Sequence, residues 1–217
     1  MSKVVQKLNK LNNPESFIQI NTVKGFKYID RAGEIVNSYH KKDAPPQFSM
    51  ALNGLVINEP ANKINQLKIT SETFWLKFVE IDSLDMVSKI FAKEAEKTLK
   101  ILEVEKANRI GWRNYFIYDF KNEEEQKKYL KKFTVIDKTN PILIRLEIKT
   151  DKEFNANLMI QPVIKTDTEK TKGVLFDVDI FKNGDIKIED ISKILNSFRE
   201  YLSDENGFLN IINSTFD

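Results

Sequence analysis

The chain has 217 residues and a formal net charge of +2, from 34 basic and 32 acidic residues, so its bulk charge does not favour a protein that neutralises nucleic-acid phosphates. It contains no cysteine, which excludes disulfides, thiolate nucleophiles and cysteine-ligated metal sites. Hydrophobic residues make up 41% of the chain, enough for a sizeable core. We therefore expect a single domain, 1–217, that can be divided into halves 1–120 and 121–217.

The histidine content and the hydropathy of the chain limit the kinds of site and the cellular location that we expect. Its one histidine, His40, excludes multi-histidine metal sites and lies in a polar stretch before two prolines, which indicates an exposed loop. No apolar run is long enough to span a bilayer, and the amino-terminal stretch lacks the apolar core of a signal peptide. We expect a cytoplasmic protein with no cofactor and no membrane association.

The amino-terminal part shows short, weakly patterned elements. Residues 1–14 are expected to form a short polar helix that ends at Pro14. Strand-type runs follow at 16–23 and 25–30. The second run leads into Asp-Arg-Ala-Gly, a hairpin pattern in which Gly33 would take the positive-φ position.

A stronger pattern follows in the next segment. Residues 47–57 resume extended structure, and the runs 64–70 and 73–81 form a strand pair joined by a tight polar turn at Ser71 and Glu72. A helix then begins after Asp82 or Ser83, either of which can cap it, and runs to about Leu102. Its inner stripe has the spacing of an amphipathic helix: Leu84, Val87, Phe91, Ala95, Thr98 and Leu102.

The carboxyl half repeats the order of strands followed by a helix. A helix at 121–133 has its glutamates first and its lysines last, as the helix dipole favours. Three strands are then expected at 141–150, 154–165 and 173–181. An amphipathic helix at 188–203 and a short helical tail at 208–216 follow them. Hairpin-length connections imply antiparallel pairing. The sequence predicts an α+β fold in which two long amphipathic helices pack on a curved, mainly antiparallel sheet. Two related strand-strand-strand-helix halves would give the same order of elements along the chain.

The stretch NRIGWRNYFIYDF, residues 108–120, is a strand with two unlike faces. One face is rich in aromatic side chains, and the other carries Arg109, Gly111, Arg113, Tyr115 and Asp119. The guanidinium group suits a carboxylate or a phosphate. Gly111 removes a side chain between the two arginines, which indicates a bulge or the close approach of a backbone or a ligand.

Two other strands add charges to sheet faces. Asp177 and Asp179 lie two residues apart and project from one face, a spacing at which carboxylates can bind magnesium. Arg145 and Glu147 face outward from the run ILIRLEIK. The candidate binding residues are therefore Arg109, Arg113, Tyr115, Arg145, Asp177 and Asp179. Internal charge pairing across strands, a ligand- or partner-binding surface and a metal-dependent site all remain open for them. We assign no catalytic residue.

The run from Trp75 to Phe120, with its RIG core, resembles a sporadically distributed prokaryotic family of uncharacterised proteins that has an RIGxRY-like strand motif. The run VLFDVDIF, 174–181, and the phenylalanine-containing tail are similar to it as well, so the resemblance covers roughly 65–217. In this chain Asn114 separates Arg113 from the following tyrosine. The resemblance implies a place on mobile genetic islands, where defence and regulatory accessory proteins occur.

The sequence favours a non-catalytic binding or regulatory protein over an enzyme. It would act through a protein partner or a ligand, in a mobile-element or phage-defence system. One alternative is a nucleic-acid-binding protein that uses Arg109, Arg113, Arg145 and nearby aromatic side chains. The other is a magnesium-dependent phosphoryl-transfer enzyme that uses Asp177 and Asp179.

Overall fold

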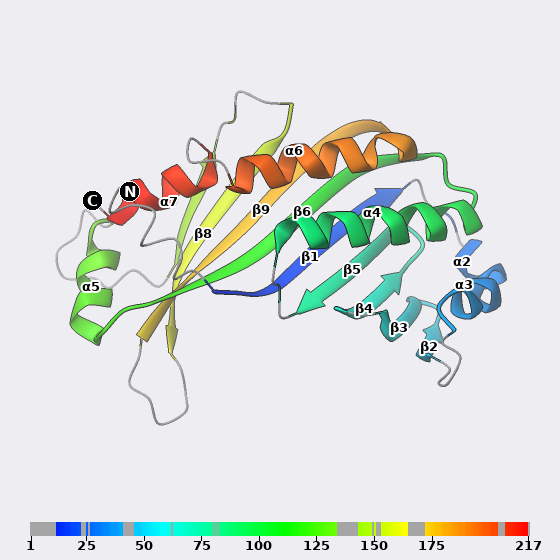
Figure 1. The fold of residues 1–217 in the computed structure, drawn as a ribbon, viewed down its shortest axis with the longest axis horizontal. Coiled ribbons are helices and arrows are strands. Elements are labelled where there is room, and N and C mark those ends of the chain that lie inside the picture. Colours follow the sequence, from blue (N-terminus) through cyan, green and yellow to red (C-terminus); the bar gives the residue numbers. More distant parts are fainter. Residues whose placement is uncertain are drawn as a thin grey trace. The chain divides into compact units, whose positions relative to one another are not determined.

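The structure is a computed structural model of the chain, and it describes residues 12–22, 25, 27–40, 46–61, 63–79, 81, 83–133, 143–148, 150, 153–164, 172–203 and 207–216. These residues form an α+β fold with one open antiparallel sheet of nine strands (Figure 1), so the predicted fold class with its curved sheet is confirmed. The strand order is β2-β3-β4-β5-β1-β6-β9-β8-β7.

The strands of this sheet are β1 Asn12–Thr22, β2 Gln47–Ala51, β3 Gly54–Ala61, β4 Ile64–Ile69, β5 Thr73–Val79, β6 Lys106–Asp119, β7 Ile144–Ile148, β8 Asn155–Ile164 and β9 Lys172–Lys187. The helices in the described residues are α2 Lys27–Asp30, α3 Ala32–Ser38, α4 Leu84–Ile101, α5 Glu123–Lys131, α6 Ile191–Ser203 and α7 Phe208–Phe216, with a 3-10 turn, η1, at Ile188–Asp190. None of the described helices combines the length and the apolar composition needed to cross a membrane.

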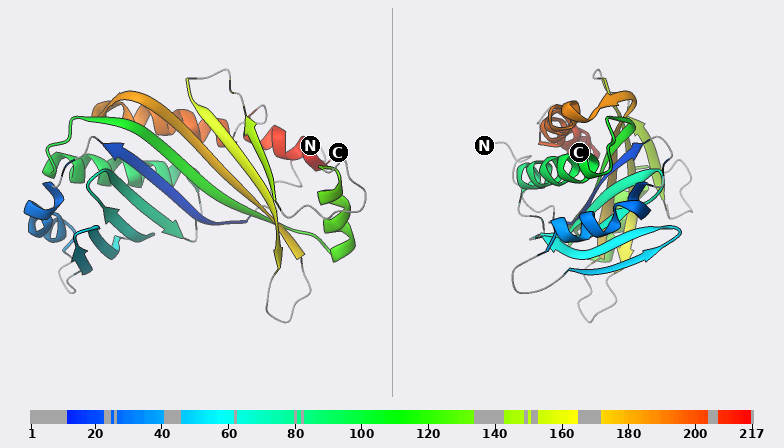
Figure 2. Two further views of the ribbon diagram at one scale, coloured as in Figure 1. Left: turned by 180° about the vertical axis from the view of Figure 1, so that it is seen from behind. Right: turned by 90° about the vertical axis from the view of Figure 1, so that its right-hand side faces the viewer.

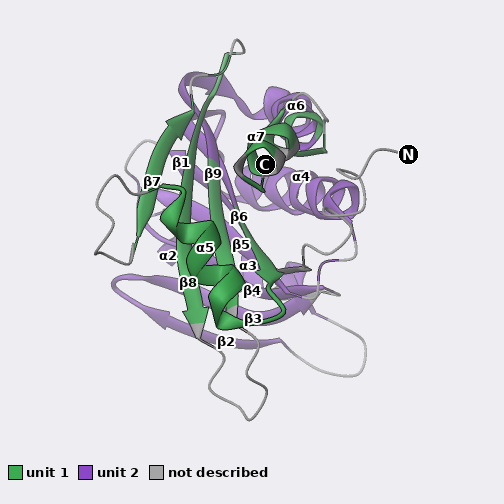
Figure 3. Cartoon of the chain, turned by 90° about the vertical axis from the view of Figure 1, so that its left-hand side faces the viewer, with its two compact units in different colours: residues 1–14, 114–179, 200–217 green, residues 15–113, 180–199 purple. Residues whose placement is uncertain are grey.

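The chain divides into two compact units (Figure 3). Unit 1 comprises residues 1–14, 114–179 and 200–217, and unit 2 comprises residues 15–113 and 180–199. Each unit is therefore assembled from segments that are distant in the sequence. The expectation of a single domain with halves at residue 120 stays a prediction.

Unit 2 forms its core between α4 and the strands beneath it. On β5, Phe74, Leu76 and Phe78 are buried, and the residues between them are half-buried. The ring of Phe74 lies 5.6 Å from that of Phe91 on α4. Ser83 caps α4 as predicted, because its hydroxyl accepts hydrogen bonds from the first free amides of the helix. The predicted tight turn between β4 and β5 is also present.

The predicted hairpin around Gly33 is wrong, because residues 27–38 form the helices α2 and α3. The side chains of Tyr28, Ala32, Ile35 and Tyr39 are buried and recur every three or four residues. That spacing is the period of an amphipathic helix, and it outweighs the local turn chemistry of Asp-Arg-Ala-Gly. Both helices lie beside the β2–β3 hairpin (Figures 1 and 2).

Two other predictions for this part of the chain concern the amino-terminal helix and His40. The predicted helix at 1–14 lies mostly outside the described residues, and β1 begins at Asn12, within its last turn. His40 is exposed and lies two residues after the end of α3, outside any helix or strand, as predicted for a loop residue.

Unit 1 is organised around aromatic side chains on β6, α5, β9 and α7. The ring of Phe216 lies 4.7 Å from that of Tyr118 and 4.8 Å from that of Tyr129, and Phe116 stacks on Phe208 at 5.7 Å. The predicted helical tail therefore packs back on the sheet. The buried side chain of Gln126 donates a hydrogen bond to the carbonyl of Gly173, which ties α5 to β9.

Candidate functional site

The two faces predicted for the arginine-bearing strand, β6, are present in the structure. Ile110, Trp112 and Asn114 are fully buried, whereas Arg113 on the opposite face is exposed. Trp112 is held by a hydrogen bond of 2.6 Å from its indole nitrogen to the hydroxyl of Ser16, which is also buried. The aromatic face is therefore core, as expected.

Gly111 provides room for a neighbour on its own strand. A β-carbon at this position would lie 2.7 Å from Nη1 of Arg109, so the guanidinium group occupies the space over the glycine. The same group lies 4.9 Å from the centre of the Phe181 ring, in the range of a cation–π contact. The sequence predicted a bulge or the close approach of a backbone or a ligand at Gly111, whereas the structure places the side chain of Arg109 there.

The other predicted binding residues differ in exposure. Arg113 and Arg145 are exposed, Tyr115 and Asp179 are half-buried, and Asp177 is only 4% exposed. Arg113, Tyr115, Asp177 and Asp179 all have interaction partners within the protein. Within the described ranges, no group of three or more histidine or acidic side chains could hold a metal ion. The charge-pairing, nucleic-acid and magnesium hypotheses for these residues stay predictions.

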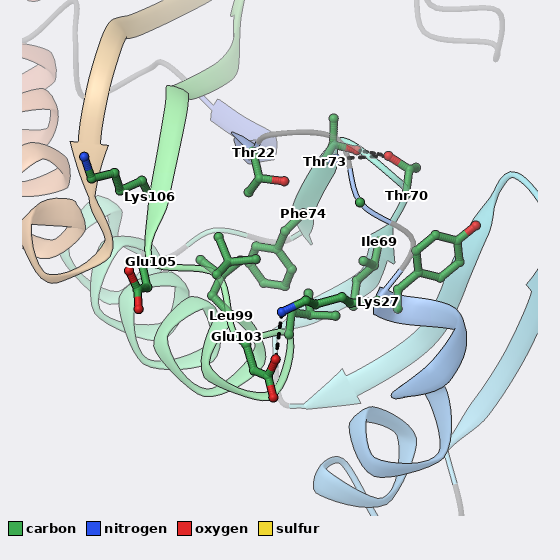
Figure 4. Close-up of a pocket in the computed structure, with 14 residues that line it drawn as sticks. Thr22, Lys27, Ile69, Thr70, Thr73, Phe74, Leu99, Glu103, Glu105 and Lys106 are labelled. Atoms are coloured by element: carbon green, nitrogen blue, oxygen red, sulfur yellow. Dashed lines mark hydrogen bonds and ion pairs between the residues drawn. The ribbon is translucent and has the colours of Figure 1, made fainter.

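Unit 2 contains a cavity of about 370 Å³ that the sequence did not predict (Figure 4). Its volume falls in the range of small-molecule sites, roughly 300–1,000 Å³. The lining comes from the end of β1, from α2, from the β4–β5 turn and from the segment that joins α4 to β6. Its residues are Thr22, Gly25, Lys27, Tyr28, Ile69, Thr70, Thr73, Phe74, Leu99, Leu102, Glu103, Val104, Glu105 and Lys106.

The lining divides into an apolar part and a polar part. Ile69, Phe74 and Leu99 are buried core residues. The polar part includes the hydroxyls of Thr70 and Thr73, which share a hydrogen bond of 2.7 Å in the β4–β5 turn. A ligand in this cavity would meet apolar surface on one side and hydroxyl and charged groups on the other.

An ion pair between two exposed side chains of the cavity lining joins α2 to the segment after α4. Nζ of Lys27 lies 2.7 Å from one carboxylate oxygen of Glu103, and a guanidinium nitrogen of Arg31 lies 2.9 Å from the other (Figure 4 shows the lysine contact). The hydrogen bond from Lys27 is the main reason that the pKa of Glu103 is lowered, and the positive charges of Lys27 and Arg31 add to it. Glu103 is therefore a carboxylate at neutral pH.

The backbone of Glu103 is unusual for its residue type. The amide of Val104 donates to the carbonyl of Leu99 at 2.9 Å, and the amide of Glu103 donates to that of Lys100 at 3.0 Å. These two bonds define a Schellman motif at the end of α4, in which the residue after the cap is usually glycine. Here that residue is Glu103, with a φ of 52°. A left-handed conformation is unfavourable for a residue with a β-carbon, so its carboxylate is placed at the cavity at a cost in backbone energy.

The cavity wall is also joined to the β2–β3 hairpin. Tyr28 is buried, and its hydroxyl donates a hydrogen bond of 2.9 Å to the backbone carbonyl of Leu52 in the hairpin turn. On the far side of the cavity, Lys106 forms an ion pair of 2.8 Å with Asp185, which raises the pKa of the lysine. The lining therefore holds two lysines and two glutamates, a balanced set of charges.

No protein-family model matches the chain, and no curated protein matches it. Among solved structures, it shows a weak likeness to the Mycobacterium tuberculosis type VII secretion system chaperone EspG5 in complex with a PE25–PPE41 dimer, at 6% sequence identity and a TM-score of 0.18. The likeness covers 92% of this chain and 78% of that chain. A TM-score this low supports neither a shared fold nor a shared function.

Proposed function

We propose that this chain is a non-catalytic binding protein whose unit 2 cavity receives a small zwitterionic molecule with an apolar body, of the class of the large hydrophobic amino acids. The observation that carries the proposal is the placement of Glu103. Its left-handed backbone is costly and its carboxylate lies at the cavity, the combination expected where a residue is kept for binding.

The charges of the site favour a ligand that bears both signs. Lys27 and Glu103 pair with each other, and Arg31 also contacts Glu103. A molecule with one amine and one carboxylate can pair with both residues, since its carboxylate can bind Lys27 and its amine can bind Glu103. Neither charge is then left without a counter-ion. A purely anionic ligand would leave Glu103 with Arg31 alone, and a purely cationic ligand would leave Lys27 without Glu103. The balance of two lysines and two glutamates in the lining agrees with a ligand of zero net charge.

The apolar part of the lining favours a ligand with a bulky hydrocarbon group. Phe74, Ile69 and Leu99 would cover that group, and burial of apolar area contributes roughly 25 cal/mol per Å². Glycine or alanine would leave most of this surface uncovered. The ion pairs of Lys27, Glu103 and Lys106 support a role of these groups in binding.

We further propose that the bound ligand regulates contact with a protein partner, in a prokaryotic mobile-element or phage-defence system. The support is the hydrogen bond that joins Tyr28, in the cavity wall, to the turn of an exposed hairpin. The pathway rests on the family resemblance of residues 65–217. A cytoplasmic location fits a free amino acid as the ligand.

Calorimetric titration of the whole chain tests the proposal. L-phenylalanine, L-leucine and L-tryptophan are the candidate ligands. Three probes each lack one feature: 3-phenylpropionate has no amine, 2-phenylethylamine has no carboxylate, and glycine has no apolar body. We expect saturable binding of at least one candidate and weaker binding of the probes.

A pair of lysine variants locates the binding. Lys27→Gln should weaken the affinity about tenfold or more, because one charge-assisted hydrogen bond is lost. Lys89→Gln is the matched control, since Lys89 is an exposed lysine of α4 that does not line the cavity. The absence of saturable binding by all three amino acids, or an equal loss in both variants, would contradict the proposal.

A further inference from the structure

Strand β2 ends the sheet order in unit 2, and among the described strands it pairs only with β3. All five of its residues are exposed. The exposed fraction is 56% for Phe48 and 44% for Met50, and Leu52 in the following turn reaches 90%.

The sequence of β2, QFSMA, contains no charge. Sheet edges that must stay monomeric usually carry lysine, proline or another charge, and β7, which ends the order in unit 1, has exposed Arg145 and Glu147.

The register of the hairpin shows which backbone groups of β2 face outward. Ala51 pairs with Gly54 across a two-residue turn, and a pair in that position is of the doubly hydrogen-bonded kind. Because the two kinds of pair alternate, the pair of Ser49 with Val56 is also hydrogen-bonded. The amide and carbonyl groups of Phe48 and Met50 therefore point away from β3. An extended backbone placed beside β2 can therefore pair with them.

We propose that a second copy of this chain supplies that backbone, through antiparallel pairing of β2 with β2 about a two-fold axis at Ser49. In this register Phe48 lies opposite Met50 of the second copy, and the same contact occurs again on the other side of the axis. Methionine sulfur and an aromatic ring attract each other.

The sequence of β2 favours a second copy over an unrelated strand. Its two large apolar side chains lie at equal distances from Ser49, so the strand is complementary to its own reversed sequence. With no charge in QFSMA, two copies meet no like-charge repulsion across the axis. A pairing of five residues on each side buries less than a standard interface of about 1,600 Å². The dimer is therefore concentration-dependent.

Cysteine trapping tests the register directly, because the chain has no cysteine of its own. Ser49→Cys places the only thiol on the axis, opposite its copy in a non-hydrogen-bonded pair, with a Cα separation of about 4.5 Å that a disulfide can span. Gln47→Cys is the matched control. Its two thiols would lie four strand positions apart, about 13 Å, which is out of reach. Mild oxidation should give a disulfide-linked dimer of Ser49→Cys at least ten times faster than of Gln47→Cys.

Sedimentation of the unmodified chain tests the same proposal without a thiol. The weight-average mass should rise toward that of a dimer as the protein concentration increases. Met50→Lys, at an exposed position, should keep the fold and hold the chain as a monomer. Equal cross-linking of the two cysteine variants overturns the proposal, as does a mass that is constant with concentration or unaffected by Met50→Lys. None of these readouts depends on what the cavity binds.

Discussion

The hydroxyl of Tyr28 donates a hydrogen bond of 2.9 Å to the backbone carbonyl of Leu52, and so connects a buried residue of the cavity wall to the turn of an exposed hairpin. We expect Tyr28→Phe to lower the free energy of unfolding by about 1 kcal/mol, the usual contribution of such a bond. Urea unfolding measures the change. Leu52→Ala keeps the carbonyl and removes only an exposed side chain, so it should stay within about 0.5 kcal/mol of the wild type. Equal stability of Tyr28→Phe and wild type would mean that the bond does not hold the hairpin.

The conformation of Glu103 predicts opposite effects on stability and binding. Glu103→Gly relieves the unfavourable positive φ, and Glu103→Gln keeps it, whereas both remove the carboxylate. The glycine variant should therefore unfold at a higher urea concentration than the glutamine variant, although the added freedom of glycine in the unfolded chain offsets part of the gain. Both variants should bind hydrophobic amino acids more weakly than the wild type. A glycine variant that is no more stable than the glutamine variant would show that the conformation carries no cost.

The ion pairs of Glu103 and Asp85 predict a loss of stability in acid. The pKa of Glu103 is lowered mainly by its hydrogen bond from Lys27, and that of Asp85 mainly by its hydrogen bond from Lys89. A carboxyl whose pKa is lower in the folded than in the unfolded chain stabilises the fold above its unfolded pKa, about 4. This contribution is lost as the pH falls through the folded value.

The measurement compares wild type with Glu103→Gln and Asp85→Asn by urea unfolding at pH 7 and at pH 3. The wild type should be the most stable of the three at pH 7, and the differences should shrink at pH 3. Differences that are the same at both pH values would contradict the assignment of these pKa shifts.

The long amphipathic elements could be predicted from the sequence because their burial follows from local periodicity. The stripe on α4 and the alternation on β5 each contain enough residues to show one period clearly. The short segment from Lys27 to Ser38 was predicted wrongly, since a Gly beside an Asp and an Arg has the chemistry of a turn. The segment is short, so its buried positions, Tyr28 and Ile35 among them, give too brief a helical pattern to outweigh that chemistry in a prediction from the sequence.

The cavity could not be predicted from the sequence because its lining comes from segments as far apart as Thr22 and Lys106. One local sign was present. The stretch after Ile101 ends a strong helix without a glycine, so a left-handed cap there falls to a residue with a β-carbon, which is Glu103. The exposed edge of β2 was equally hidden, since alternation cannot show which strand lies last in a sheet.

Two glycines with crowded surroundings should respond differently to the same substitution. A β-carbon at Gly54 would lie 2.6 Å from the backbone carbonyl oxygen of Ile69, and the residue has a φ of 148°. Backbone cannot move aside cheaply, so Gly54→Ala should lower the free energy of unfolding by about 2 kcal/mol or more. The atoms nearest to a β-carbon at Gly111 belong to the end of the Arg109 side chain, which can rotate away.

For Gly111→Ala we expect a change within about 0.5 kcal/mol. The loss of the contact between Arg109 and the Phe181 ring, about 0.5–1 kcal/mol, is offset by a similar gain from replacing glycine inside a strand. Urea unfolding of both variants against the wild type provides the comparison. A large destabilisation by Gly111→Ala would mean that Arg109 cannot leave its position over the ring, and that its packing there holds β6 to β9 within unit 2.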